Sequence, residues 1–340
     1  MKHYFSSLQG KRSLPGCTAI ARTLTILALA CLPIHTAGGA EDGNARESDS
    51  WVELGFVNQF DADFEDDDGT FDVRGGSARG QFMIRLDDDS VRVRVRASYH
   101  GVEYNFDDPP TIAGTEFKPF NTIHVGRLNP MIDVRVSEDW LVFAGPLLEA
   151  SLENSADLAN SLKWGGLIGA EYRVSPELTL GAGLVGVSEI EDDFYLQPLL
   201  LLDWQPMKKL NVHAESWTTR GGRLEVAYRL IDQVEIATSL SYRRERFRLK
   251  QRITSAGPPP VARTGNRGVA EDRSVIPAVR VSYLPDADFV RDTLGNIRID
   301  LEAGVAVAGD VRIEDRNGSS IQTMSYDPAP ILELRLMIPL

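Results

Sequence analysis

Cysteine is nearly absent from this chain of 340 residues, and its two cysteines, Cys17 and Cys31, both lie within the first 40 positions. From Glu41 onward there is none. A disulfide scaffold, a zinc-thiolate site and a cysteine nucleophile are therefore excluded from that part of the chain.

Catalytic motifs are equally scarce. Beyond residue 40 the histidines are His100, His124 and His213, and the sequence has no HExxH, no serine in a nucleophile elbow and no phosphate-binding glycine loop. His100 follows Ser98, and His213 precedes Glu215, by two residues each, so each pair shares one face of a strand. A catalytic triad is defined by geometry, which the spacing of residues in the sequence does not give. An outer-membrane hydrolase is therefore the least favoured of three functional hypotheses, after a channel and a closed structural barrel. We expect no enzyme activity and no cofactor.

Acidic residues are missing from the first 40 positions, where four basic residues precede the apolar run 24–34. This order, closed by small residues, predicts a cleavable secretory signal over 1–40. The run is shorter than the roughly 20 residues that a membrane-spanning helix needs. Residues 41–50 are polar and are predicted to form a flexible periplasmic lead-in.

Basic residues are outnumbered over the chain as a whole, with 36 Lys and Arg against 49 Asp and Glu and a net charge of -13. Removal of the signal leaves 32 basic residues, which gives a net charge of -17. Nucleic-acid binding requires a basic footprint, so we expect no nucleic-acid partner.

One acidic run, Asp61 to Asp68, could in principle bind a hard cation through clustered carboxylates. Its glycine, Gly69, comes at the ninth position and not at the sixth, which an EF-hand loop requires. A solvated loop is therefore favoured over a metal site, and the cation site stays an open alternative.

The abundant feature of this sequence is alternation with a period of two residues. Between 162 and 243 the even positions are mostly apolar and the odd positions carry most of the charge, through five consecutive segments. Side chains on a strand point alternately to opposite faces, so this pattern predicts a sheet with one apolar and one charged face. Short runs rich in Gly, Pro, Asp and Glu separate the segments and predict hairpins, which makes the sheet a meander.

Extended along the chain, the pattern predicts an all-β fold of about fourteen antiparallel strands, with twelve as an alternative. If these strands form a barrel in the outer membrane with both chain ends in the periplasm, alternate connections lie on the outer side. Those connections, such as 106–120, 251–272 and 310–328, are longer on average than the connections on the periplasmic side. The predicted strands are 51–60, 70–86, 91–105, 121–136, 140–152, 161–174, 178–190, 194–204, 209–218, 222–231, 233–250, 273–284, 296–309 and 329–340.

Such a sheet fits either a soluble lipocalin-like barrel with an apolar interior or an outer-membrane barrel with an apolar exterior. The export signal and the even strand count favour a transmembrane antiparallel meander β-barrel over 51–340, located in the outer membrane. Leu180, Leu184, Leu200 and Val226 would then face lipid, whereas Thr179, Gly183 and Gln197 would face the lumen and tolerate arginine better. Seven aromatic residues near strand ends also suit the lipid-water boundary: Trp140, Trp164, Tyr172, Trp204, Tyr228, Tyr242 and Tyr283.

The final alternating run Leu332 to Leu340 resembles the C-terminal assembly signal of bacterial outer-membrane barrel proteins, although that signal usually ends in an aromatic residue and this run ends in Leu340. The stretch from Trp164-Gly165-Gly166 to Arg248 also resembles an uncharacterised barrel family, a domain of unknown function. These resemblances imply a barrel in the outer membrane, and they imply no activity.

Two functional hypotheses follow from this reading. The first is a passive channel for small solutes or ions, and the alternative is a closed structural or surface-interaction barrel. The expected partners are outer-membrane lipid, lipopolysaccharide and the barrel-assembly machinery, and the sequence does not indicate an oligomeric state. The residues predicted to line the lumen are Arg92, Arg94, Arg96, Glu171, Arg173, Glu215, Arg223, Glu225 and Arg229.

Overall fold

The computed structural model describes residues 50–65, 69–86, 90–107, 109–112, 115–116, 118–190, 194–217, 221–252, 263–285, 297–315 and 318–340. All of them belong to the compact unit Arg46–Leu340. The predicted signal, and the lead-in up to residue 49, lie outside the described residues.

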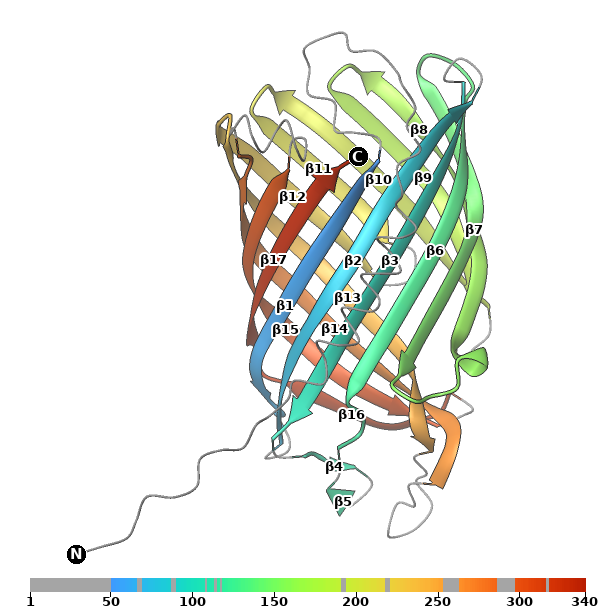
Figure 1. Ribbon diagram of the computed structural model, residues 1–340, viewed down its shortest axis with the longest axis vertical. Coiled ribbons are helices and arrows are strands. Elements are labelled where there is room, and N and C mark those ends of the chain that lie inside the picture. The colour runs from blue at the N-terminus through green and yellow to red at the C-terminus, as the bar shows by residue number, and fades with distance from the viewer. Residues whose placement is uncertain are drawn as a thin grey trace, which may run out of the picture. The chain divides into compact units, whose positions relative to one another are not determined.

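The chain forms a closed antiparallel β-barrel of fourteen strands (Figure 1). Consecutive strands pair with each other, as predicted for a meander, and β1 closes the ring by pairing with β17. The last of the fourteen strands is split into β16 and β17, which pair with successive halves of β15. The strands of the ring are β1 (Trp51–Asp63), β2 (Thr70–Leu86), β3 (Val91–Phe106), β6 (Thr122–Arg135), β7 (Trp140–Glu153), β8 (Leu162–Ser175), β9 (Leu178–Ser188), β10 (Phe194–Met207), β11 (Leu210–Trp217), β12 (Gly221–Ile231), β13 (Val234–Arg252), β14 (Arg263–Tyr283), β15 (Arg298–Glu314), β16 (Ser320–Tyr326) and β17 (Ala329–Pro339).

The two ends of the barrel differ in their connections. At one end, called the turn end and drawn uppermost in Figure 1, short turns join β6 to β7, β8 to β9, β10 to β11 and β12 to β13. At the other, the loop end, β3 is joined to β6 by a segment that carries the small hairpin β4 (Thr111–Ile112) and β5 (Thr115–Glu116). The 3-10 helix η1 (Ala159–Ser161) precedes β8. In the part of the chain described, no helix is long and apolar enough to cross a membrane.

The apolar face of the sheet is the outer face of the barrel. Leu180, Leu184, Leu200 and Val226 are exposed, as predicted, while their odd-numbered neighbours point into the barrel. The same pattern continues around the ring because the register of each hairpin keeps apolar residues beside apolar residues. Other exposed apolar residues on this surface are Phe56, Ile84, Ile132, Leu148, Ile168, Leu240, Val279, Leu301 and Leu334.

The aromatic residues predicted near strand ends are exposed on the same outer surface. Trp140 and Tyr172 lie side by side at the turn end, with ring centroids 4.8 Å apart. Trp204, Tyr228 and Tyr283 also lie near strand ends at the turn end, whereas Trp164 and Tyr242 lie toward the loop end. Amphipathic rings at both limits of an apolar band are typical of a lipid-facing barrel.

The loop end corrects two of the predicted strand limits. β14 begins at Arg263 within the predicted loop 251–272, and β15 and β16 occupy much of the predicted loop 310–328. Ala308 has a positive φ of 50°, and β15 reverses its faces there, so that Val311 and Ile313 point inward although Leu301 points outward. The alternation in the sequence breaks at this irregularity, which is why the prediction ended the strand at 309.

Candidate functional site in the lumen

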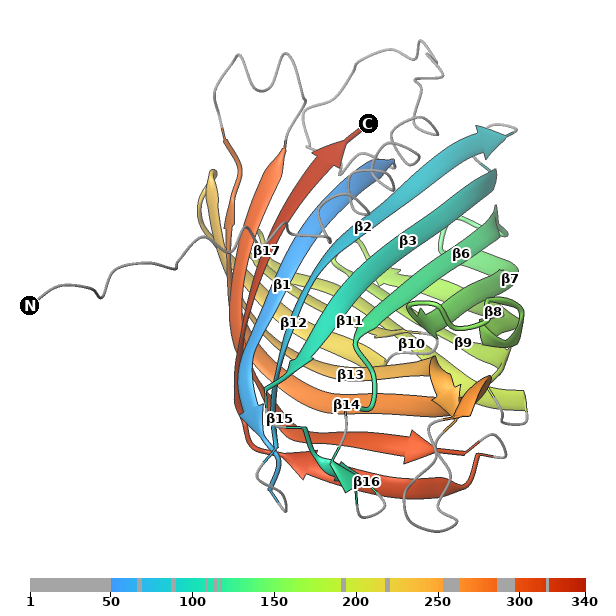
Figure 2. The same ribbon diagram turned by 60° about the horizontal axis from the view of Figure 1, so that its bottom comes forward.

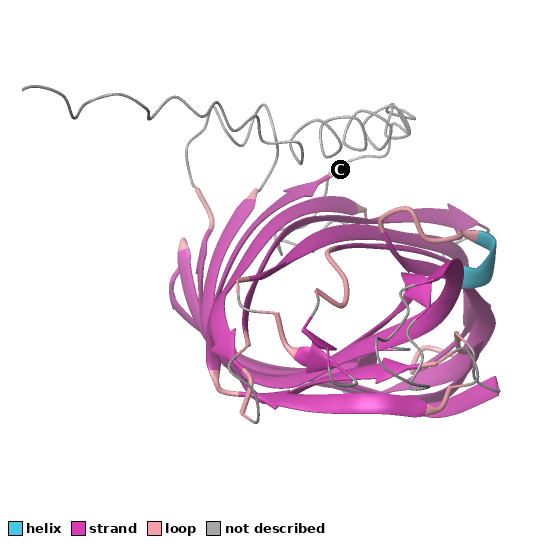
Figure 3. Cartoon of the chain, turned by 90° about the horizontal axis from the view of Figure 1, so that it is seen from below, coloured by secondary structure: helices cyan, strands magenta, loops and turns pink. Residues whose placement is uncertain are grey.

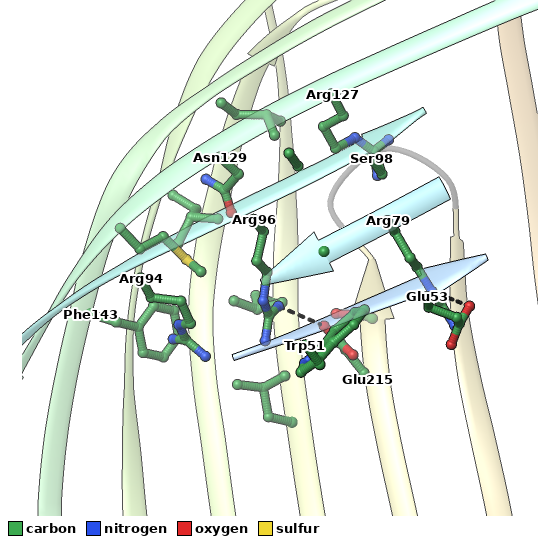
Figure 4. A pocket seen from close by; sticks show the side chains of 18 of the residues that line it. Trp51, Glu53, Arg79, Arg94, Arg96, Ser98, Arg127, Asn129, Phe143 and Glu215 are labelled. Atoms are coloured by element: carbon green, nitrogen blue, oxygen red, sulfur yellow. Dashed lines mark hydrogen bonds and ion pairs between the residues drawn. The ribbon is translucent and has the colours of Figure 1, made fainter. Parts of the chain in front are cut away.

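A cavity of about 570 Å³ lies in the barrel interior and extends from Trp51 near the turn end to Arg127 and Leu147 halfway along the strands (Figure 4). Among the described residues, its walls come from ten strands, which are β1, β2, β3, β6 to β11 and β17, while β12 to β15 contribute no lining residue. A volume of this size falls within the range of about 300–1,000 Å³ that is typical of small-molecule sites.

One wall of the cavity is basic. Arg79 on β2, Arg94 and Arg96 on β3 and Arg127 on β6 reach it from neighbouring strands. Three of these arginines bind acids of adjacent strands: Arg79 lies 2.6 Å from Glu53, Arg94 2.9 Å from Asp133, and Arg127 2.9 Å from Glu149. The three acids are buried, and each is thus neutralised by an arginine of an adjacent strand.

Arg96 differs from the other three arginines. Its Nε donates to the amide oxygen of Gln81 at 2.8 Å, and its Nη1 reaches Glu215 of β11 across the lumen at 3.5 Å (Figure 4). The two charged side chains are 44% and 28% exposed, so this contact between opposite walls is solvated and weak.

A second wall of the cavity is apolar, whereas the sequence predicted a charged inner face. Met131, Phe143, Leu147, Leu167 and Leu199 form a buried cluster there, although most of them occupy positions that were expected to be polar. The sequence gives one indication of this wall, because the segment 140–152 is apolar on both faces through Gly145.

Glycine makes room for this apolar wall. A Cβ atom at Gly169 would lie 2.4 Å from the ring of Phe143, so the ring can lie against the sheet only because β8 has no side chain at that point. This contact fixes the phenyl ring against the wall and keeps the cavity open beside it.

Toward the loop end, the interior is filled by an aromatic cluster. Tyr104 and Phe120 have ring centroids 4.9 Å apart, and Phe120 and Phe247 5.0 Å apart. All members are buried, with exposed fractions of 4% or less. The aromatic cluster consists of Phe64, Phe71, Tyr104, Phe106, Phe120, Phe247 and Tyr326.

A fully buried carboxylate lies within this aromatic cluster. Asp272 accepts hydrogen bonds from the hydroxyl groups of Tyr104 at 2.8 Å and Tyr326 at 3.0 Å. Arg243 lies 3.4 Å from the same carboxylate and also donates to Gln59. Asp272 therefore ties β14 to β3, β13 and β16 at the loop end.

An ion-pair network fills the neighbouring part of the loop end. Lys163 lies 3.3 Å from both Glu149 and Glu189, and Arg246 binds Glu314 at 2.6 Å and Glu271 at 3.3 Å. The side chains named are at most 4% exposed, so the network is desolvated.

The end of β13 separates the aromatic cluster from this network. Phe247 belongs to the cluster, while Arg246 and Arg248 point to the opposite side, where Arg248 donates to the carbonyl oxygen of Asn160 at 2.7 Å. Arg248 also pairs with Leu152 of β7, although β8 to β12 lie between β7 and β13 in the ring. β13 thus leans across the loop end. Figure 3 views the loop end of the barrel from below, and Figure 2 views it obliquely.

The residues predicted to line the lumen fall into three groups. Arg94, Arg96, Glu171 and Glu215 contribute to the cavity. Arg223 and Glu225 lie in a different set of ion pairs, in which Arg223 binds Glu302 at 2.9 Å and Glu225 binds Arg280. Arg92, Arg173 and Arg229 are not among the cavity residues. Contact between a solute and any of these nine residues stays a prediction.

The three histidines in the described part of the chain make contacts with tyrosine or glutamate side chains. His124 shares a hydrogen bond of 2.7 Å with the Tyr99 hydroxyl, His100 lies 3.5 Å from Glu245, and His213 lies 3.8 Å from Glu215. The described residues include no group of three or more His, Cys, Asp or Glu that could hold a metal ion. Asp66 to Asp68 of the acidic run lie outside the described residues.

The chain is similar to known proteins in structure and not in sequence. No family model matches the sequence, and no curated protein matches it significantly. The barrel resembles a FadL homologue of Pseudomonas aeruginosa (TM-score 0.49, 11% identity, 85% of this chain and 90% of that chain covered). It also resembles an outer-membrane channel of Pseudomonas putida F1 (TM-score 0.41, 10% identity, 88% and 99% covered) and the P. putida toluene transporter TodX (TM-score 0.43, 12% identity, 87% and 90% covered). Similarity at this level does not indicate a shared solute.

Proposed function

We propose that this chain is an outer-membrane barrel that acts as a passive channel for small solutes. The observation that carries the proposal is a cavity of about 570 Å³ inside a barrel whose outer face is apolar and whose interior holds most of the charged side chains beside apolar ones. An apolar exterior and a polar interior are the arrangement of lipid-embedded barrels, and the reverse of that in soluble barrels. In this proposal the barrel-assembly machinery inserts the chain, and the loop end faces lipopolysaccharide.

The loop end narrows the path through the proposed channel. The aromatic cluster and the ion-pair network occupy the interior there, and β13 lies between them. Passage of a solute therefore requires movement of these side chains or of the β13–β14 hairpin. We expect small and intermittent current steps, unlike the steady conductance of a wide pore.

Planar-bilayer recording of the purified protein tests this proposal. Small steps are expected for the unaltered chain, and larger or more frequent steps for the double variant Phe120→Ala/Phe247→Ala, which removes two rings from the aromatic cluster. Phe56→Ala is the matched control, because Phe56 is 53% exposed on the outer face, and its removal should leave the current unchanged.

The second candidate is a closed barrel whose surface contacts a partner, and the ion-pair network at the loop end favours it. In this case the unaltered chain and the double variant would both be silent, even though heat-modifiable migration shows that they are folded. Such silence would reject the channel.

A further inference from the structure

The charges that surround the cavity are separated by sign. Its arginines come from β2, β3 and β6, while the carboxylates of Glu171, Asp203 and Glu215 come from β8, β10 and β11. Two further cavity carboxylates, Glu53 and Glu333, have arginines of their own at 2.6 Å (Arg79) and 3.9 Å (Arg335). A transverse field therefore runs between the two arcs, and it would orient a dipolar solute.

Three of these charges are available to a ligand. Arg96 has only the weak 3.5 Å contact with Glu215, because its other bond is to the neutral amide of Gln81. Among the described residues, Glu171 and Asp203 have no ion pair within 4 Å, although Glu171 is close enough to be attracted to Arg94 and Arg96. The cavity thus offers one cationic group that faces two carboxylates.

The apolar wall lies beside these groups. Phe143, Leu147, Leu167 and Leu199 reach the cavity from β7, β8 and β10, which lie next to or within the acidic arc. A fully polar solute would leave this surface in contact with water, and a purely apolar solute would bury the charged groups without partners, which is unfavourable. The lining therefore fits a solute with both kinds of group.

We propose that this cavity binds small zwitterions that carry an apolar group, the chemical class of aromatic and branched α-amino acids. The carboxylate of the ligand lies at Arg96, its ammonium group at Glu171 and Asp203, and its apolar group against Phe143 and the leucines. A carboxylate at Arg96 replaces the weak contact with Glu215 by a charge-assisted hydrogen bond. This inference rests on the proposed function in that it names the class of solute that the proposed channel would carry. Binding of the solute can be measured whether or not the solute passes through the barrel.

Binding of L-phenylalanine to the full chain in detergent micelles, measured by isothermal titration calorimetry against empty micelles, tests this inference. The comparison ligands each lack one group: 3-phenylpropanoate lacks the ammonium, 2-phenylethylamine the carboxylate and L-alanine the ring. We expect L-phenylalanine to bind at least about tenfold more tightly than each of them, which corresponds to about 1.4 kcal/mol.

Two variants assign the ends of the ligand. Arg96→Gln should weaken binding of L-phenylalanine and leave that of 2-phenylethylamine unchanged, whereas Glu171→Gln should weaken L-phenylalanine and leave 3-phenylpropanoate unchanged. Arg229→Gln is the matched control and should change neither, because Arg229 is not among the cavity residues.

Equal affinity for L-phenylalanine and L-alanine, or no binding by the folded barrel, would overturn the inference. Current steps without such binding would overturn the inference and leave the channel intact. Selective binding in a barrel that is silent in planar bilayers would support the inference and reject the channel.

Discussion

An arginine in place of Leu184 is expected to destabilise the barrel by about 2 to 4 kcal/mol, because the charged group would have to enter the apolar part of the bilayer. Leu184 is 49% exposed on the outer face of β9, and it pairs with Ile168 in the middle of β8 and with Pro198 of β10. The free energy of unfolding in phospholipid vesicles, obtained by urea titration, measures the effect.

Gln197→Arg is the matched control for this substitution. Gln197 precedes Pro198, so it lies at nearly the same depth as Leu184, but it points toward the interior. We expect a much smaller loss of stability there, and a larger loss at Gln197 than at Leu184 would contradict the assignment of the faces. Gly183, which was predicted to tolerate arginine, is unsuitable, because a Cβ atom there would lie 2.4 Å from the carbonyl oxygen of Ile168.

Asp272→Ala is expected to lower the free energy of unfolding by about 3 to 5 kcal/mol, the range for removal of one partner from a buried ion pair. The substitution would leave Arg243 without its carboxylate and the hydroxyl groups of Tyr104 and Tyr326 without their acceptor. Because these groups hold the loop end together, we also expect faster proteolysis of the β13–β14 hairpin. Urea titration and limited proteolysis measure the two effects.

Asp310→Ala serves as the comparison on the adjacent strand. Asp310 binds Arg273 at 2.8 Å, but the two side chains are 20% and 34% exposed. An ion pair at a solvated position contributes about 0 to 1 kcal/mol. Similar losses in Asp272→Ala and Asp310→Ala would show that Asp272 is not buried as described.

The barrel could be predicted from the sequence because its outer face follows one simple rule. Residues that face outward in the middle of a strand are mostly apolar, so Leu180, Leu200 and Val226 recur at even positions with the period of a strand. The strand count and the meander also follow, since turns interrupt the alternation at each hairpin. Alternation and turns involve residues that are close together in the sequence, so one sequence is enough to predict them.

The contents of the lumen could not be predicted in the same way. Arg96 and Glu215 are 119 residues apart, and Asp272 meets Tyr104 across 168 residues, so their contacts depend on closure of the ring. The apolar wall was missed because inward positions were expected to be polar, whereas Phe143 and Leu167 fill the interior at such positions. At the loop end both faces of β13 are packed, and the alternation that marks a lipid-facing strand is lost.

The central claim is that the apolar face meets lipid, and cell fractionation of a Gram-negative host that expresses the full chain tests it most directly. Our account expects the protein in the outer-membrane fraction, released by detergent, with migration on gels that shifts upon heating because the closed barrel resists unfolding. Recovery of folded protein from the soluble periplasmic fraction without detergent would contradict the account.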